Sequence, residues 1–213
     1  MKKKIAVAVS LLLVLALSIG GTIAWLTDKT QAITNTFTVG KVDIELTEPA
    51  GEQINYAYAI VPGDAYAKDP TITVAKNSEK SYVFVTIAET NNTITVDNQS
   101  VPIVQWAIAD GWTPLEGATG AKVYYQEVDK PTADAGTVLQ VFAGNSNKNE
   151  LKNGQVTINE NLTMDDVTNS TKPAIKIQAA AIQFANIADE YDAWNNLPSD
   201  FTNGITVTKP VKP

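Results

Sequence analysis

The sequence predicts an all-β fold, a jelly-roll-like antiparallel β-sandwich with one or two short helices. The first observation is a series of short runs, rich in β-branched and aromatic residues, spread over residues 35–208. The second is that strong turn signals, such as Pro62-Gly63 and Asp110-Gly111, separate these runs. The third is that only residues 188–195 have a good helix pattern, with acidic residues in the first turn. Many short strands with little helix are typical of a sandwich or a jelly roll.

The first predicted strand covers residues 35–48. Its apolar residues alternate as far as Val39 and then resume one position out of phase at Val42. Such a slip would turn every following side chain to the other face of a sheet. A β-bulge at Gly40 and Lys41 would absorb the slip, and glycine is favoured at that position.

A second strand is predicted at residues 81–89, and it is apolar on both faces. This pattern is typical of a central strand that is covered on both sides. We therefore expect this strand to lie in the middle of a sheet, with a second layer or a docked segment over each face. Tyr82 and Phe84 fall on one face, and Val83, Val85 and Ile87 fall on the other.

The rest of the chain supplies further short strands. Residues 174–184 are ambiguous, because their alanine run suits a helix, whereas Ile175 and Ile177 alternate with polar residues. We predict a strand there. Residues 161–173 are polar and irregular, and residues 209–213 are expected to form a disordered tail. Further strands are expected at residues 55–61, 71–75, 93–96, 103–108, 122–128, 137–143, 155–158 (a small edge strand) and 205–208.

The N-terminus resembles a secretory leader. Three lysines precede an apolar run, and small residues follow it up to Ala24. We expect a signal peptide at residues 1–24, with cleavage between Ala24 and Trp25. The alternative is a retained transmembrane helix, because the uncharged stretch is just long enough to span a bilayer. No linker divides the remaining chain, so residues 35–208 are predicted to form one sandwich.

The composition excludes several kinds of chemistry. The 213 residues include no Cys and no His, and every basic residue is Lys. Disulfides, structural zinc sites, His or Cys nucleophilic mechanisms and bidentate Arg contacts are therefore excluded. The formal net charge is −7, and removing a leader with three lysines leaves 13 lysines against 23 acidic residues, a net charge of −10. This acidity argues against nucleic acid as a partner.

Residues 20–28 (GGTIAWLTD), followed by residues 35–40 (NTFTVG), form the junction between the leader and the rest of the chain. This junction resembles that of the TasA/camelysin family of exported biofilm-matrix and surface proteins. Similar motifs follow in the family's order through nearly the whole chain. They are residues 61–64 (VPGD), 68–74 (KDPTITV), 81–85 (SYVFV), 110–112 (DGW), 123–125 (VYY), 181–183 (AIQ) and 193–194 (AW).

This resemblance implies a function and its partners. It implies a secreted biofilm-matrix fibre subunit, processed by a SipW-type signal peptidase, located in the extracellular matrix or on the cell surface. Its partner would be itself in a homopolymer, with or without an accessory fibre protein. Assembly would follow donor-strand exchange, in which the freed residues 25–34 of one subunit pair with the sheet of the next. The residues implied as the donor strand are Trp25, Leu26, Thr27, Asp28 and Ile33.

Enzymatic readings find little support in the sequence. The camelysin branch carries a protease label, but a zinc site of the H-E-x-x-H type is impossible without His. Paired carboxylates could serve a glycosidase, and Asp165-Asp166 could bind Ca²⁺, yet no spacing supports either role. We predict no catalytic residue, no metal site and no cofactor. The acids considered for such roles are Glu89, Glu116, Glu127 and Glu190.

Two alternatives to the fibre subunit stay open. One is a monomeric surface adhesin or carbohydrate-binding sandwich. Trp112 and the pair Tyr124-Tyr125 could present aromatic rings to sugars, although core packing is the expected use of such large side chains. The other alternative, ranked last, is a camelysin-like hydrolase.

Overall fold

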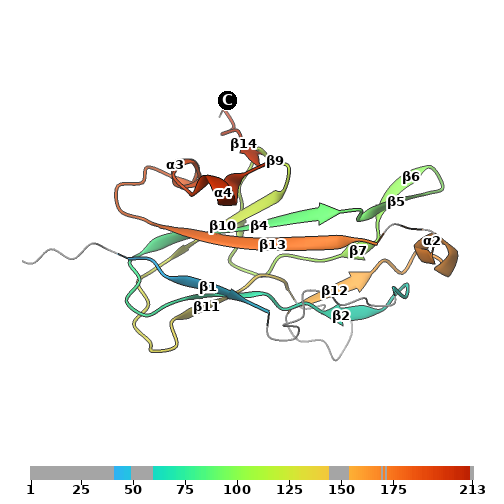
Figure 1. The fold of residues 1–213 in the computed structure, drawn as a ribbon, viewed down its shortest axis with the longest axis horizontal. Coiled ribbons are helices and arrows are strands. Elements are labelled where there is room, and N and C mark those ends of the chain that lie inside the picture. The colour runs from blue at the N-terminus through green and yellow to red at the C-terminus, as the bar shows by residue number, and fades with distance from the viewer. Residues whose placement is uncertain (1–40, 49–59, 144–153, 169, 171, 212–213) are drawn as a thin grey trace, which may run out of the picture. The chain divides into compact units, whose positions relative to one another are not determined.

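The computed structural model describes residues 41–48, 60–143, 154–168, 170 and 172–211. The chain divides into two compact units, residues 1–39 and residues 40–213, and the described residues all belong to the second unit. These residues hold fourteen strands and three short helices, so the predicted all-β fold is confirmed (Figure 1). No helix within the described ranges is long and apolar enough to cross a membrane.

The first layer is a four-stranded antiparallel sheet in the order β13-β4-β10-β8. Its central strand β4 is buried over its first seven residues, because both faces carry apolar side chains. The predicted central strand is therefore confirmed. The bounds are β4 (Ser81–Thr90), β8 (Thr113–Pro114), β10 (Lys122–Val128) and β13 (Ala174–Gln183).

The second layer consists of two small sheets, β1-β3-β11 and β2-β12-β7. Backbone hydrogen bonds connect them into one layer: Gly154 N–H, just before β12, donates to the carbonyl of Phe142 after β11 (3.1 Å), and Ala109 N–H, after β7, donates to the Val141 carbonyl (2.9 Å). A bridge between Ile108 and Phe142 extends the β7 side. The bounds are β1 (Ile44–Thr47), β2 (Ala65–Ala67), β3 (Thr71–Val74), β7 (Val104–Gln105), β11 (Thr137–Gln140) and β12 (Gln155–Ile158).

The main core lies between the two layers. Alternate β4 side chains point into it because the side-chain period of a strand is two residues. Val83, Val85 and Ile87 from β4 meet Ile72 and Val74 from β3, and all five are at most 1% exposed. The alternation predicted for β4 is therefore confirmed on this face.

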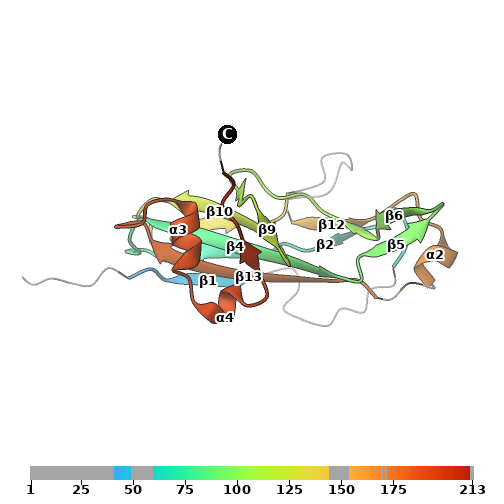
Figure 2. The same ribbon diagram turned by 90° about the horizontal axis from the view of Figure 1, so that it is seen from above.

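A second core cluster covers the outer face of the first layer. Helices α3 and α4 lie over this face, as Figures 1 and 2 show. The ring centroids of Trp194 and Phe84 are 5.7 Å apart, and Tyr82 and Phe201 belong to the same cluster. The Asp189 side chain caps α3 by accepting from two backbone N–H groups. The bounds are α3 (Glu190–Asn195), in agreement with the predicted helix, and α4 (Ser199–Thr202).

Of the remaining short elements, β5 matches the strand predicted at residues 93–96 and β14 lies within the strand predicted at residues 205–208, whereas β6, β9 and α2 were not predicted. A hairpin of β5 and β6 turns through Asp97 and Asn98, which both have positive φ, as a two-residue turn of this kind requires. A short helix, α2, interrupts residues 161–173, where we expected only irregular structure. Thr163 and Asp166 cap its start reciprocally. The bounds are β5 (Thr93–Val96), β6 (Gln99–Pro102), α2 (Met164–Thr168), β9 (Ala118–Thr119) and β14 (Thr206–Val207).

Other strand predictions need correction. The prediction that residues 155–158 form an edge strand is wrong, because β12 lies between β2 and β7, whose residues are distant in sequence. Only the end of the first predicted strand is observed, as β1, and residues 35–40 with the predicted bulge lie outside the described residues. The predicted strand at residues 55–61 also falls mostly outside them, and Ile60 and Val61 are not in a strand.

Candidate functional site

The predicted processing and donor residues precede the described part of the chain. Ala24, Trp25, Leu26, Thr27, Asp28 and Ile33 all lie outside the described residues, so their predicted roles stay predictions. Strand exchange also requires a surface that accepts an extended segment, and the described residues can be searched for such a surface. Such a surface is a strand edge with unpaired backbone groups.

The outer edge of β13 has this property. This ten-residue strand pairs with β4 on one side, and no described strand pairs with its other side. Phe184 N–H donates to the Lys80 carbonyl (2.7 Å), which continues the β4 ladder. Because alternate residues of an antiparallel strand point their N–H and C=O groups in opposite directions, the odd-numbered residues of β13 direct theirs away from β4. Residues 175, 177, 179 and 181 therefore present backbone donors and acceptors at the edge.

Strand β1 is the terminal strand of the second layer on the same side of the sandwich. It lies beside β13, although the two strands are not paired (Figure 1). β1 has four residues and β13 has ten, so β1 accompanies less than half of β13. Leu46 in β1 is 37% exposed. This side of the sandwich is therefore bounded by two strand edges of unequal length that pair with no other described strand.

The core is incompletely covered along this side. The odd-numbered side chains of β13 pack against the main core but stay half-buried, as does Ile44 in β1. Their direct neighbours on β4 are completely covered: Val85, which pairs with Ala179, is 0% exposed, and Ile87, which pairs with Ile177, is 1% exposed. Burial thus falls sharply from the central strand to the edge strand of the same core.

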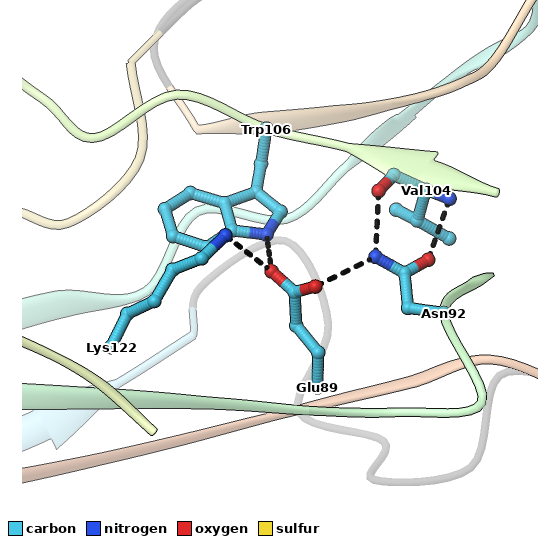
Figure 3. A network of polar contacts seen from close by, with 5 residues as sticks. All are labelled: Glu89, Asn92, Val104, Trp106 and Lys122. Atoms are coloured by element: carbon cyan, nitrogen blue, oxygen red, sulfur yellow. Dashed lines mark hydrogen bonds and ion pairs between the residues drawn. The ribbon is translucent and has the colours of Figure 1, made fainter. Parts of the chain in front are cut away.

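A polar clasp around Glu89, at the end of the central strand β4, links the two layers (Figure 3). One carboxylate oxygen accepts from Trp106 Nε1 (2.8 Å) and from Lys122 Nζ (2.9 Å), and the other accepts from Asn92 Nδ2 (3.1 Å). The Lys122 ammonium also lies 4.4 Å from the Trp106 ring centroid. The clasp therefore connects β4 and β10 of the first layer to the segment that follows β7 in the second.

Asn92 fixes the clasp to the backbone. Its Nδ2 donates to the Val104 carbonyl (2.8 Å), and its Oδ1 accepts from Val104 N–H (2.7 Å). The side chain is 4% exposed, so it replaces a backbone partner in a buried position. Sequence reasoning identified Glu89 only as one of several acids and did not identify Asn92, Trp106 or Lys122. The three-residue spacing of Glu89 and Asn92 after an apolar strand is the only local signal.

The hydrogen bonds of the clasp lower the pKa of Glu89. Partial burial raises its pKa, but hydrogen bonds from Asn92, Lys122 and Trp106 outweigh burial and hold the pKa below its ordinary value of 4.5. A carboxyl whose pKa is lowered in the folded state stabilises the fold above its unfolded-state pKa. This contribution is lost as the pH falls through the lowered pKa.

We expect acid to weaken the fold partly through Glu89. Between about pH 3 and pH 6, the free energy of unfolding should fall with decreasing pH, and Glu89→Gln should make that fall shallower. Urea denaturation at a series of pH values measures this. The same substitution at the exposed Glu45 in β1 is the control. A Glu89→Gln profile parallel to that of the wild type would contradict the role of the clasp. The acid sensitivity would then be assigned to other carboxyl groups, such as Asp166 and Asp189, whose pKa values are also lowered.

Two of the other acids considered from the sequence, Glu127 and Asp166, take part in local contacts. Glu127 forms an ion pair with Lys80 (3.2 Å), and Asp166 accepts hydrogen bonds from Thr163 at the start of α2. Trp112 is 7% exposed and donates to the Gln140 carbonyl (2.7 Å), so its predicted use in core packing is confirmed. The described residues thus use these groups in caps, ion pairs and packing.

Together, these features define an all-β sandwich whose layers are linked by a polar clasp at Glu89 and whose edge strand β13 pairs with no described strand on its outer side. Residues 1–100 match the family model described as camelysin metallo-endopeptidase, so this part of the chain is similar to that family. The resemblance found in the sequence motifs is thereby confirmed. No curated protein matches the chain significantly.

The family description implies a metal, and the donor set of this chain does not fit one of the usual peptidase type. The whole sequence has no His and no Cys. Within the described ranges, no group of three or more Asp or Glu residues is placed to hold an ion. The carboxylate of Glu89 is held by three hydrogen-bond donors. We derive no catalytic step through a metal.

Proposed function

We propose that this protein is a secreted subunit of an extracellular-matrix fibre, assembled when its processed N-terminal segment pairs with the sheet of another copy. The observation that carries the proposal is the open edge of β13, which is ten residues long and backed by half-buried apolar side chains. The camelysin-family match over the first 100 residues supports the same assignment. An added strand would satisfy the unpaired backbone groups and cover the exposed flank of the core.

The processing step would act as the switch for assembly. While the leader is attached, a membrane-inserted apolar run would hold residues 25–34 away from other copies. Cleavage at Ala24–Trp25 by a SipW-type signal peptidase would free that segment outside the cell. Because each copy both donates and accepts a strand through different surfaces, the contact is heterologous. A heterologous contact that does not close into a ring extends into a filament.

The test compares three purified chains that all lack residues 1–24. The chain beginning at Trp25 is expected to form filaments in electron micrographs and to sediment as a polymer. Deletion of residues 25–34 should abolish both properties. A chain in which residues 25–34 are replaced by ten Gly and Ser residues is the control for length, and it should also remain monomeric. Monomers of the first chain at all concentrations would contradict the proposal and favour a monomeric adhesin.

A further inference from the structure

We propose that Asn203 is a site of spontaneous covalent modification, at which the side-chain amide is lost as ammonia and the backbone of the turn between α4 and β14 is altered. The chain contains two Asn-Gly pairs, Asn153-Gly154 and Asn203-Gly204. Such pairs are reactive because glycine has no Cβ to obstruct the approach of its backbone nitrogen to the asparagine side chain. Nothing in the two dipeptides distinguishes them, whereas their surroundings in the fold differ.

The reaction requires water as its only co-reactant. The backbone nitrogen of Gly204 bonds to Cγ of Asn203, and the side-chain NH2 group leaves with the backbone proton as ammonia. Water then opens the resulting cyclic imide at one of its two carbonyl carbons. Opening at Cγ gives ordinary aspartate, and opening at the main-chain carbonyl gives isoaspartate, whose backbone is one carbon longer. This chemistry is one reason why asparagine counts among the thermolabile residues.

Asn203 and Gly204 form the two corners of an exposed type II turn. Asn203 has a φ of −58° and a ψ of 127°, Gly204 has a φ of 77°, and Ile205 N–H donates to the Thr202 carbonyl (3.0 Å). A Cβ placed on Gly204 would meet nothing within 4 Å apart from its chain neighbours. No described group accepts a hydrogen bond from Gly204 N–H. Because the hydrogen bond of the turn does not involve the peptide between the two corners, this peptide can rotate towards the Asn203 side chain.

Gly154 has the opposite surroundings. Its N–H donates to the Phe142 carbonyl (3.1 Å), and the residue is buried. A Cβ at Gly154 would lie 2.2 Å from the Cβ of Asp69, so the backbone there is packed against another segment of the chain. Attack by this nitrogen would first require its hydrogen bond to open. Asn153 itself lies outside the described residues, so the protection is assigned to Gly154 alone.

The turn at Asn203 holds β14 against β9. The oxygen of Gly204 lies so close to Gly120 that a Cβ on Gly120 would be 2.3 Å from it, and β14 pairs with β9 directly after the turn. An isoaspartate at position 203 would lengthen the backbone between Thr202 and Ile205 by one carbon. It would also add a carboxylate that is ionised at neutral pH. We therefore expect this product to break the hydrogen bond of the turn and to loosen β14.

Peptide mapping by mass spectrometry tests the site. The full chain is stored in a mildly alkaline buffer, and the conversion of both asparagines is followed with time. Asn203 should be converted at least tenfold faster than Asn153 in the folded protein. In urea the two rates should agree within twofold, because both glycine nitrogens are then free. Equal rates in the folded protein, faster conversion at Asn153, or a tenfold difference that persists in urea would overturn the proposal.

Hydrogen exchange tests the consequence for β14. The isoaspartate form is separated from fresh protein by ion-exchange chromatography, and its amides at residues 205–208 should exchange at least tenfold faster. Freshly prepared Asn203→Asp carries the same charge on an unchanged backbone, and its exchange should rise less than twofold. Asn203→Gln is the matched control, which should stay unmodified during storage. Equal protection of β14 in the isoaspartate form and in fresh protein would overturn the predicted loosening.

Discussion

Trp194→Ala is expected to lower the free energy of unfolding by about 3–5 kcal/mol, the usual cost of removing a large buried aromatic side chain. Trp194 is 3% exposed at the centre of the cluster beneath α3 and α4. Its ring lies 5.7 Å from that of Phe84 and 5.8 Å from that of Phe201, measured between centroids. Alanine at this position would leave a cavity between the short helices and the sheet.

Urea denaturation followed by circular dichroism measures this effect. Tyr191→Ala is the matched control, because it removes an aromatic ring of similar size from the same helix at a half-buried position. Tyr191→Ala should lower the free energy of unfolding by about 1 kcal/mol, a typical value for substitution of a residue that is only partly buried. If the two substitutions lower the free energy of unfolding equally, Trp194 does not contribute more to stability than Tyr191, and the prediction is contradicted. An early transition with a reduced slope would show that the helices detach before the sandwich unfolds.

Asn92→Ala is expected to cost about 2–4 kcal/mol, because each buried backbone group left without a partner costs about 1–3 kcal/mol. The substitution would leave both the N–H and the carbonyl of Val104 unpaired in a region where Asn92 is 4% exposed. It would also remove one of the donors to Glu89. The loss should therefore exceed what the small change in volume alone predicts.

The control for Asn92 is its neighbour Asn91. This residue is exposed and has a φ of 54°, a conformation that glycine adopts readily. Asn91→Gly should therefore change the free energy of unfolding by only a few tenths of a kcal/mol. If Asn92→Ala unfolds at the same urea concentration as Asn91→Gly, the bonds to Val104 do not contribute as we infer. Thermal unfolding of the same three proteins provides an independent measurement.

Strands with a strong local pattern could be predicted from the sequence. β4 carries apolar residues at both parities, so its burial on both faces follows from the period of a strand alone. β10 was predicted with its observed bounds, and the alternation at Ile175 and Ile177 distinguished a strand from a helix in β13. The start of α3 could be predicted because Asp189 and the acidic residues after it favour a helix N-terminus.

Elements whose partners are distant in sequence could not be predicted. β2 has three residues, too few to show a period, and it was not predicted, whereas β7 was predicted only as part of a longer strand at residues 103–108. β12 resembles an edge strand because Gln155 and Thr157 are polar, yet pairing with two distant strands places it inside the layer. The clasp depends on Glu89, Trp106 and Lys122 approaching one another across the two layers. No local pattern in the sequence encodes that approach.

The sequence by itself determined the fold class, the absence of Cys and His chemistry, and the family resemblance that the match over residues 1–100 confirmed. These properties depend on composition and on periods of a few residues, which are fixed before the chain folds. Only the tertiary structure decided that Glu89 and its partners link the two layers, and that β13 lies at an edge where no described strand pairs with its outer side. Both features arise from the order of strands in each layer, and hence from contacts between distant residues, because a strand becomes an edge only when no other strand lies beside it.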